Sequence, residues 1–398
     1  MTEQAKVPAI RFAGFTDPWE QRKLGDVASS FDYGLNAAAT EYDGQNKYLR
    51  ITDIDDETHE FSKSDLTTPL ADLAMSADYL LKEGDLLFAR TGASVGKTYL
   101  YRQFDGMVYF AGFLIRARIG EGADPEFAYQ ATLTDAYKKY VAITSQRSGQ
   151  PGVNAQEYAD YQLMLPSKTE QQQIGMTLRS LDDLITLHQR KYDKLVIFKK
   201  SMLEKMFPKD GESVPEIRFA GFTDPWEQRK ASEVFQIVDD RGHPTLPVLS
   251  ATQNQGMIYR DDSGRYIGHD ESNEIGYKRV LPGDFVVHLR SFQGGFAHSQ
   301  YEGITSPAYT VFRAKEPTSH SDRFWKHWFM SEHFIAGLST VTYGIRDGRS
   351  ISVDEFMNTF LAFPAVEEQA AISRLFDYLD DLITLHQRKL ELLQNIKK

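Results

Sequence analysis

The first candidate for chemistry is GASVGKT at residues 92–98, which follows an apolar run and ends in Gly-Lys-Thr. A phosphate-binding loop requires four residues between its first glycine and the Gly-Lys pair. Only Ala93, Ser94 and Val95 intervene here, and the comparable FQGGFAH of the second half contains no lysine. We therefore predict a backbone turn that needs glycine. A nucleotide-dependent enzyme with a P-loop-like site is kept as an alternative.

Other motifs of catalysis are missing from the sequence. No G-x-G-x-x-G follows an expected strand, and neither HExxH nor G-x-S-x-G occurs. The absence of cysteine excludes thiolate zinc sites and cysteine nucleophiles, and the ten histidines do not cluster. We predict a chain that is not an enzyme, with no metal and no cofactor of its own.

Four loops carry side chains suited to contacting DNA bases: ARTGASVGK, TSQRSGQPGVNAQEY, LRSFQGGFAHSQY and TYGIRDGRSIS. Arginine pairs with guanine edges, glutamine and asparagine pair with adenine edges, and serine, lysine and backbone amides hold phosphates. The net charge of −11 argues against a protein that coats nucleic acid, but not against a few specific contacts. No signal peptide or membrane span is evident, so a cytoplasmic location is expected.

Two exact repeats indicate how the chain is organised. RFAGFTDPWEQRK at residues 11–23 returns at 218–230, and LDDLITLHQRK at 181–191 returns at 379–389. The segments between them share only short similarities, such as GDLLFAR and GDFVVHLR. A period near 200 residues is too long for a solenoid, so we predict two domains of similar fold, each followed by the same connector.

The connectors have the pattern of long helices that pack along a partner helix, because their apolar positions are spaced by alternate fours and threes. Two helices with the same pattern in one chain are expected to pair antiparallel, although each could instead pack on its own domain. The predicted helix-pairing residues are Leu181, Ile185, His188, Tyr192, Leu195, Met202, Leu379, Ile383, His386, Leu390 and Leu393.

The segments outside the connectors alternate strand-like apolar runs with helical patches, which predicts an α+β fold. The expected internal repeat is pseudo-twofold, with two strand-rich domains separated by two long helices in an antiparallel coiled coil. We place the first domain with its lead-in at residues 1–165, the central helix at 166–208, the second domain with its lead-in at 209–363, and the C-terminal helix at 364–398.

These features together resemble the specificity (S, HsdS) subunits of type I restriction-modification systems. The resemblance is carried by the repeated IRFAGFTDPWEQRK, by GDLLFARTGASVGK and by LPSKTEQQQIGMTLRSLDDLITLHQRK with its second copy, and it covers essentially all 398 residues. It implies two target recognition domains that read a bipartite double-stranded DNA sequence. It also implies two methyltransferase (M) subunits bound through the helices, with restriction (R) subunits recruited by the complex. S-adenosylmethionine, ATP and Mg²⁺ would then belong to those partners.

The resemblance also implies which residues contact DNA. In the first domain these are Arg90, Thr91, Ser94, Lys97, Gln146, Arg147, Ser148, Gln150 and Asn154. In the second domain they are Arg290, Ser291, Gln293, Gly294, Tyr343, Arg346 and Arg349. A protein-only scaffold without DNA contact is the second alternative.

Overall fold

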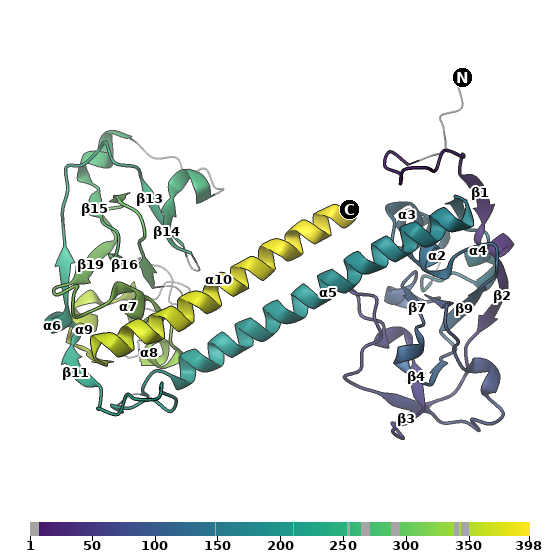
Figure 1. The fold of residues 1–398 in the computed structure, drawn as a ribbon, viewed down its shortest axis with the longest axis horizontal. Helices are drawn as coiled ribbons and strands as arrows, with labels where there is room; N and C mark the ends of the chain where they lie inside the picture. The colour runs from purple at the N-terminus through teal and green to yellow at the C-terminus, as the bar shows by residue number, and fades with distance from the viewer. Residues whose placement is uncertain are drawn as a thin grey trace. The chain divides into compact units, whose positions relative to one another are not determined.

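The structure is a computed structural model that describes residues 8–147, 149–209, 211–252, 255–263, 271–287, 295–337, 342–343 and 350–398 (Figure 1). Its chain divides into two compact units. Unit 1 contains residues 1–187 and 391–398, and unit 2 contains residues 188–390. Each unit is described on its own.

Unit 1 is built on an antiparallel four-stranded sheet. The strands lie in the order β2 (Ala28–Tyr33), β9 (Leu114–Ile119), β6 (Asp85–Ala89) and β7 (Thr98–Leu100). Every residue of β6 is buried, which explains why its sequence DLLFA is apolar without alternation after the first position. The apolar sequence MVYFAGFLIRARI at residues 107–119 predicts one strand, but a turn at Gly112 divides it between β8 (Val108–Phe110) and β9.

Smaller elements surround this sheet. They are the strand pairs β3 (Ala39–Glu41) with β5 (Thr67–Pro69) and β4 (Lys47–Leu49) with β8, the helices α1 (Leu24–Val27), α2 (Pro125–Ala131), α3 (Asp135–Thr144) and α4 (Ala155–Ala159), and short 3-10 turns η1 (Ile51–Asp53), η2 (Ala77–Tyr79), η3 (Gly92–Ser94) and η4 (Gln103–Asp105). The sequence at residues 125–143 predicts one helical patch, but it forms two helices because Thr134 caps α3 by accepting a hydrogen bond from Tyr137 N.

Unit 2 repeats the same sheet order with different residues. Its four strands are β12 (Phe235–Val238), β19 (Thr310–Ala314), β16 (Phe285–Val287) and β17 (Phe296–His298). The surrounding elements are the pairs β13 (Leu249–Thr252) with β14 (Gly256–Tyr259), β15 (Lys278–Val280) with β18 (Gly303–Thr305) and β20 (Thr342–Tyr343) with β21 (Ser350–Ile351), the turns η5 (Arg260–Ser263) and η6 (Glu271–Gly276), and the helices α6 (Ala231–Val234), α7 (Asp322–Trp328), α8 (Glu332–Gly337) and α9 (Val353–Asn358).

The two lead-in segments, residues 11–23 and 218–230, each connect a sheet domain to its long helix. In unit 1, β1 (Glu20–Lys23) pairs with β10 (Gln162–Leu165), and in unit 2, β11 (Glu227–Lys230) pairs with β22 (Phe360–Phe363) in the same register. A bidentate ion pair accompanies each strand pair, Arg11 with Glu170 and Arg218 with Glu368, at 2.8 and 2.6 Å in both units. The copied residues therefore hold the domain architecture together.

The connectors form the two longest helices, α5 (Lys168–Lys205) and α10 (Val366–Lys397). Within unit 2, the Nδ1 atoms of His188 and His386 lie 2.7 Å apart, and Lys199 Nζ lies 2.5 Å from Asp380 Oδ1. Within unit 1, Lys397 pairs with Asp182. Partners rise along one helix as they fall along the other, so the predicted antiparallel packing of α5 and α10 is confirmed.

The eleven residues predicted for helix pairing all lie in α5 or α10, and none of them is exposed. Neighbouring apolar side chains such as Leu184, Leu187 and Phe198 are exposed instead. The spacing of fours and threes therefore separates the covered side of each helix from its open side. In the described part of the chain, no helix has both the length and the apolar composition needed to cross a membrane.

Candidate nucleic-acid interface

Two loops of unit 1, far apart in sequence, form one surface at the end of the buried strand β6. The first loop (residues 90–97) is bridged to the second (residues 144–154) through Thr91 and Gly152. Gly92 N donates to Pro151 O at 3.0 Å, and Val153 N donates to Arg90 O at 2.9 Å. The residues predicted for DNA contact in these two loops are therefore brought together.

The GASVGKT segment is the turn that the sequence predicted. Gly92 and Gly96 have φ values of +70° and +85°, a region that side-chain-bearing residues rarely adopt. Lys97 Nζ lies 3.1 Å from Ile54 O and 2.5 Å from Asp56 Oδ1. The lysine that would bind phosphate in a nucleotide enzyme is thus held by groups of its own unit.

Several of the predicted DNA-binding side chains make internal contacts. The guanidinium of Arg147 donates to both carboxylate oxygens of Glu157, at 2.5 and 2.7 Å. The side chain of Asn154 accepts from Glu157 N and caps α4. Gln146 and Gln150 are exposed, and Thr91 and Ser94 are partly exposed. The uncommitted polar groups of the surface are therefore mostly amides and hydroxyls.

Arg90 differs from the other two cations of this surface. Its Nε donates to Gly112 O at 3.0 Å, and its Cζ lies 5.2 Å from the ring centroid of Tyr33 and 5.8 Å from that of Phe113. No acidic side chain among the described residues forms an ion pair with it. Phe113 is 56% exposed and Tyr33 is 45% exposed. Neither aromatic residue was predicted, because Phe113 lies in a strand-like run and Tyr33 lies outside the four loops singled out from the sequence.

The corresponding surface of unit 2 is described only in part. Arg290, Ser291, Gln293, Gly294, Arg346 and Arg349 lie outside the described residues, as does Ser148 of unit 1. Tyr343 is placed by its backbone, which forms β20 opposite β21. The prediction that these residues contact DNA therefore stays a prediction.

Each unit contains its own ion pair with a buried aspartate, at the same place in the sheet beneath the surface. Arg118 Nε lies 3.1 Å from Asp85 Oδ1 in unit 1, and Arg313 Nη2 lies 2.7 Å from Asp284 Oδ2 in unit 2. Both aspartates are almost completely buried, and burial raises the pKa of Asp284. These matching pairs align β6 and β9 with β16 and β19, residue by residue.

Within the described residues, one group of side chains has ligands spaced for a metal: His327, Asp377 and Asp380 in unit 2. Lys326 Nζ lies 3.5 Å from Asp377 and 3.4 Å from Asp380, and Lys199 also pairs with Asp380. The lysines already balance the two carboxylates. The group therefore acts as a polar link between α7 and α10, and nothing in it requires a cation.

His327 makes stability of unit 2 depend on pH. The side chain is 0% exposed, and burial lowers its pKa below the usual value near 6.5, although Nε2 donates to Asp377 Oδ1 at 3.0 Å. The folded state then binds fewer protons than the unfolded state, so stability falls as the pH drops below about 6.5. We expect His327→Gln to reduce the loss of stability between pH 7 and pH 5.

Glutamine suits this test because Gln130 occupies the matching place in α2 and donates to Asp182 Oδ2 at 2.8 Å. Urea unfolding at several pH values gives the slope of the unfolding free energy against pH. His333→Gln on the neighbouring helix α8 is the control, since His333 is not buried. An unchanged slope in His327→Gln would contradict the assignment of this dependence to His327.

Comparison with known proteins agrees with this architecture. Residues 16–196 match the family model described as the type I restriction modification DNA specificity domain. A type I restriction enzyme MjaVIII specificity subunit of Methanocaldococcus jannaschii is 22% identical over 403 residues, which cover 96% of this chain and 91% of that protein. A putative MjaX specificity subunit of the same organism is 21% identical over 397 residues, with the same coverage.

The solved S subunit of a type I restriction-modification system from M. genitalium has the same fold. Its sequence is 11% identical, its TM-score is 0.59, and the match covers 99% of this chain and 97% of that one. Two strand-rich units with paired long helices, together with the family match over residues 16–196, place the chain in the class of DNA specificity proteins. Within that class, the chain is similar over almost its whole length to the specificity subunits of type I restriction-modification systems.

Proposed function

We propose that this subunit reads a bipartite DNA target, with one unit for each half of the sequence. The observation that carries the proposal is the repeated sheet order, β2-β9-β6-β7 and β12-β19-β16-β17, built twice under loops of different sequence. Two readers of one fold with different contact residues suit two unlike half-sites. The domain boundaries we propose are residues 1–165, 166–208, 209–363 and 364–398.

We further propose that α5 and α10 hold two methyltransferase subunits, through which restriction subunits join the complex. Exposed apolar side chains on these helices support this role, since such groups often mark protein contacts; they include Leu184, Leu187, Ile197, Phe198 and Leu385. The subunit itself would need no cofactor, and S-adenosylmethionine, ATP and Mg²⁺ would be bound by its partners.

The direct test is to map methylated adenines in DNA exposed to this chain together with its methyltransferase. We expect methylation at a two-part sequence separated by a fixed number of unread bases. Methylation that is independent of sequence, or that does not require this chain, would contradict the proposal and favour the alternative of a protein-only scaffold. The same reaction without the methyltransferase gives the background.

We expect the isolated chain to bind DNA weakly and the complex to bind it at least ~10-fold more tightly at the same salt concentration. The reason is the net charge of −11, which repels phosphates unless partner subunits add positive charge around the duplex. Titration of a labelled target duplex with each form measures the difference. Equal affinities would contradict this account of the charge balance.

A further inference from the structure

We infer that Arg90, held between Tyr33 and Phe113, is the guanine-reading element of unit 1, and that the two aromatic residues position it. This inference rests on the proposed function and adds the base, the reading residue and its support. The aromatic side chains lie on β2 and on the turn before β9, outside the two loops at residues 90–97 and 144–154. They therefore extend the recognition surface beyond the residues predicted for it.

The first argument is that Arg90 is available. Lys97 is paired with Asp56 and Arg147 with Glu157, so these cations are balanced within unit 1. Arg90 has its Nε on Gly112 O, and neither of its Nη groups forms a hydrogen bond or ion pair with the described residues. Those two groups are the donors that a bidentate contact to guanine O6 and N7 uses.

The second argument is that the guanidinium is pre-positioned. Aromatic faces attract a guanidinium and limit the tilt of its plane, while the bond from Nε fixes one edge. The backbone of Arg90 is fixed as well, since its N–H donates to Phe113 O at 3.0 Å and its carbonyl accepts from Val153 N. The hydroxyl of Tyr33 accepts a hydrogen bond from Ala155 N at 3.2 Å, which ties its ring to the start of α4.

The third argument is that the two aromatic residues of this arrangement have no aromatic counterparts at the matching positions of unit 2. The strand registers and the shared Asp85–Arg118 and Asp284–Arg313 pairs align the sheets of the two units. In that alignment, unit 2 has Asp239 where unit 1 has Tyr33, and Ala308 where unit 1 has Phe113. A shared scaffold with different surface residues is what the reading of two unlike half-sites requires.

The test uses the complete complex with its methyltransferase and a pool of duplexes in which the target positions are varied. Methylation of each sequence gives a base preference at every position. We expect Arg90→Lys, which keeps the charge but loses the bidentate fork, to lower the preference for guanine at one position of one half-site by ~10-fold or more. The preferences of the other half-site should stay unchanged.

Phe113→Leu should reduce the same preference, while Phe113→Tyr, which keeps the ring, should retain it. Arg22→Lys is the matched control and should leave every preference unchanged, because Arg22 lies outside both loops and pairs with Glu20. Thermal unfolding of each variant shows whether unit 1 remains folded.

Three outcomes overturn the inference: Arg90→Lys leaves every preference intact, it lowers methylation equally for all sequences, or Phe113→Leu has no effect on the position that Arg90→Lys changes. A wild-type complex without bipartite preference would instead remove the proposed function. The two failures are therefore distinguishable.

Discussion

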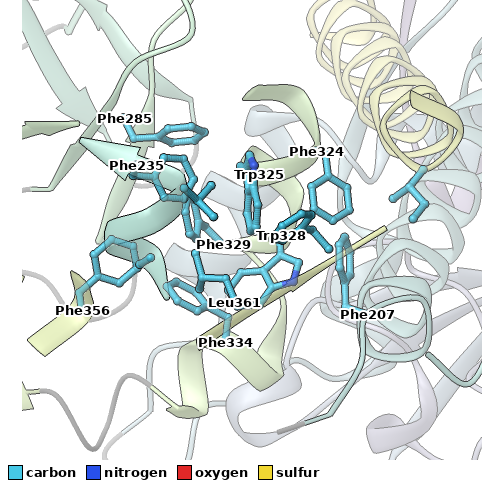
Figure 2. Close-up of a cluster of buried hydrophobic side chains, with 14 of the residues drawn as sticks. Phe207, Phe235, Phe285, Phe324, Trp325, Trp328, Phe329, Phe334, Phe356 and Leu361 are labelled. Atoms are coloured by element: carbon cyan, nitrogen blue, oxygen red, sulfur yellow. The ribbon is translucent and has the colours of Figure 1, made fainter. Parts of the chain in front are cut away.

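Replacing Phe207 by alanine should destabilise unit 2 by about 3–5 kcal/mol, because it removes a large side chain from a closed aromatic core. Phe207 is 1% exposed and follows α5 at the edge of the cluster shown in Figure 2. Its ring centroid lies 5.8 Å from those of Phe324 and Phe376 and 6.2 Å from that of Trp226. One side chain therefore joins α5, α7, α10 and the second lead-in.

Urea unfolding followed by intrinsic tryptophan fluorescence measures this effect, since Trp226, Trp325 and Trp328 belong to the same core. Phe198→Ala is the matched control, because Phe198 lies on α5, close to Phe207 in the chain, and is 47% exposed. Its effect should stay within about 0.5 kcal/mol. Similar losses of unfolding free energy in both variants would contradict the conclusion that Phe207 contributes more to the buried core than an exposed phenylalanine does.

Gly34→Ala should lower the free energy of unfolding of unit 1 by about 3 kcal/mol or more, because the added Cβ would overlap backbone atoms. A Cβ at Gly34 would lie 2.1 Å from Ala111 O and 2.7 Å from Phe110 O. These carbonyl oxygens belong to backbone, so relief requires movement of the segment that leads to Phe113. We therefore expect a loss of unfolding free energy together with a weakened preference in the half-site that unit 1 reads.

Gly122→Ala provides the comparison, because the nearest atom to its added Cβ is Val27 Cγ1 at 4.0 Å. That variant should fold and methylate as the wild type does. Equilibrium unfolding and base-preference mapping of both variants check the prediction. A fully stable Gly34→Ala protein would mean that the close approach to Ala111 can be relieved without cost.

The organisation of the chain was predictable from its sequence because the copied segments carry the contacts that hold it together. The spacing of Leu181, Ile185 and His188 identifies a covered helix face, since side chains three and four apart share one side. The repeated arginine of the lead-in and the repeated glutamate of the connector form the same ion pair twice. Repetition of both partners made the two units recognisable as copies.

The candidate recognition surface was harder to predict because loop composition does not show which groups are already paired. Lys97 and Arg147 have the residue types that bind DNA, yet their partners Asp56 and Glu157 are close only after folding. Phe113 belongs to an apolar run that predicts a buried strand, and only the turn at Gly112 places it outside. Exposure and pairing depend on tertiary contacts, which no local pattern contains.

The paired histidines of α5 and α10 have a consequence for the symmetry of the helix contact. His188 and His386 come from identical copies of LDDLITLHQRK, but a hydrogen bond between their Nδ1 atoms needs one donor and one acceptor. The two rings must therefore adopt different tautomers, one protonated on Nδ1 and the other on Nε2. The contact joins identical residues from two copies of one sequence, but its protons are arranged asymmetrically. Either histidine can be the donor.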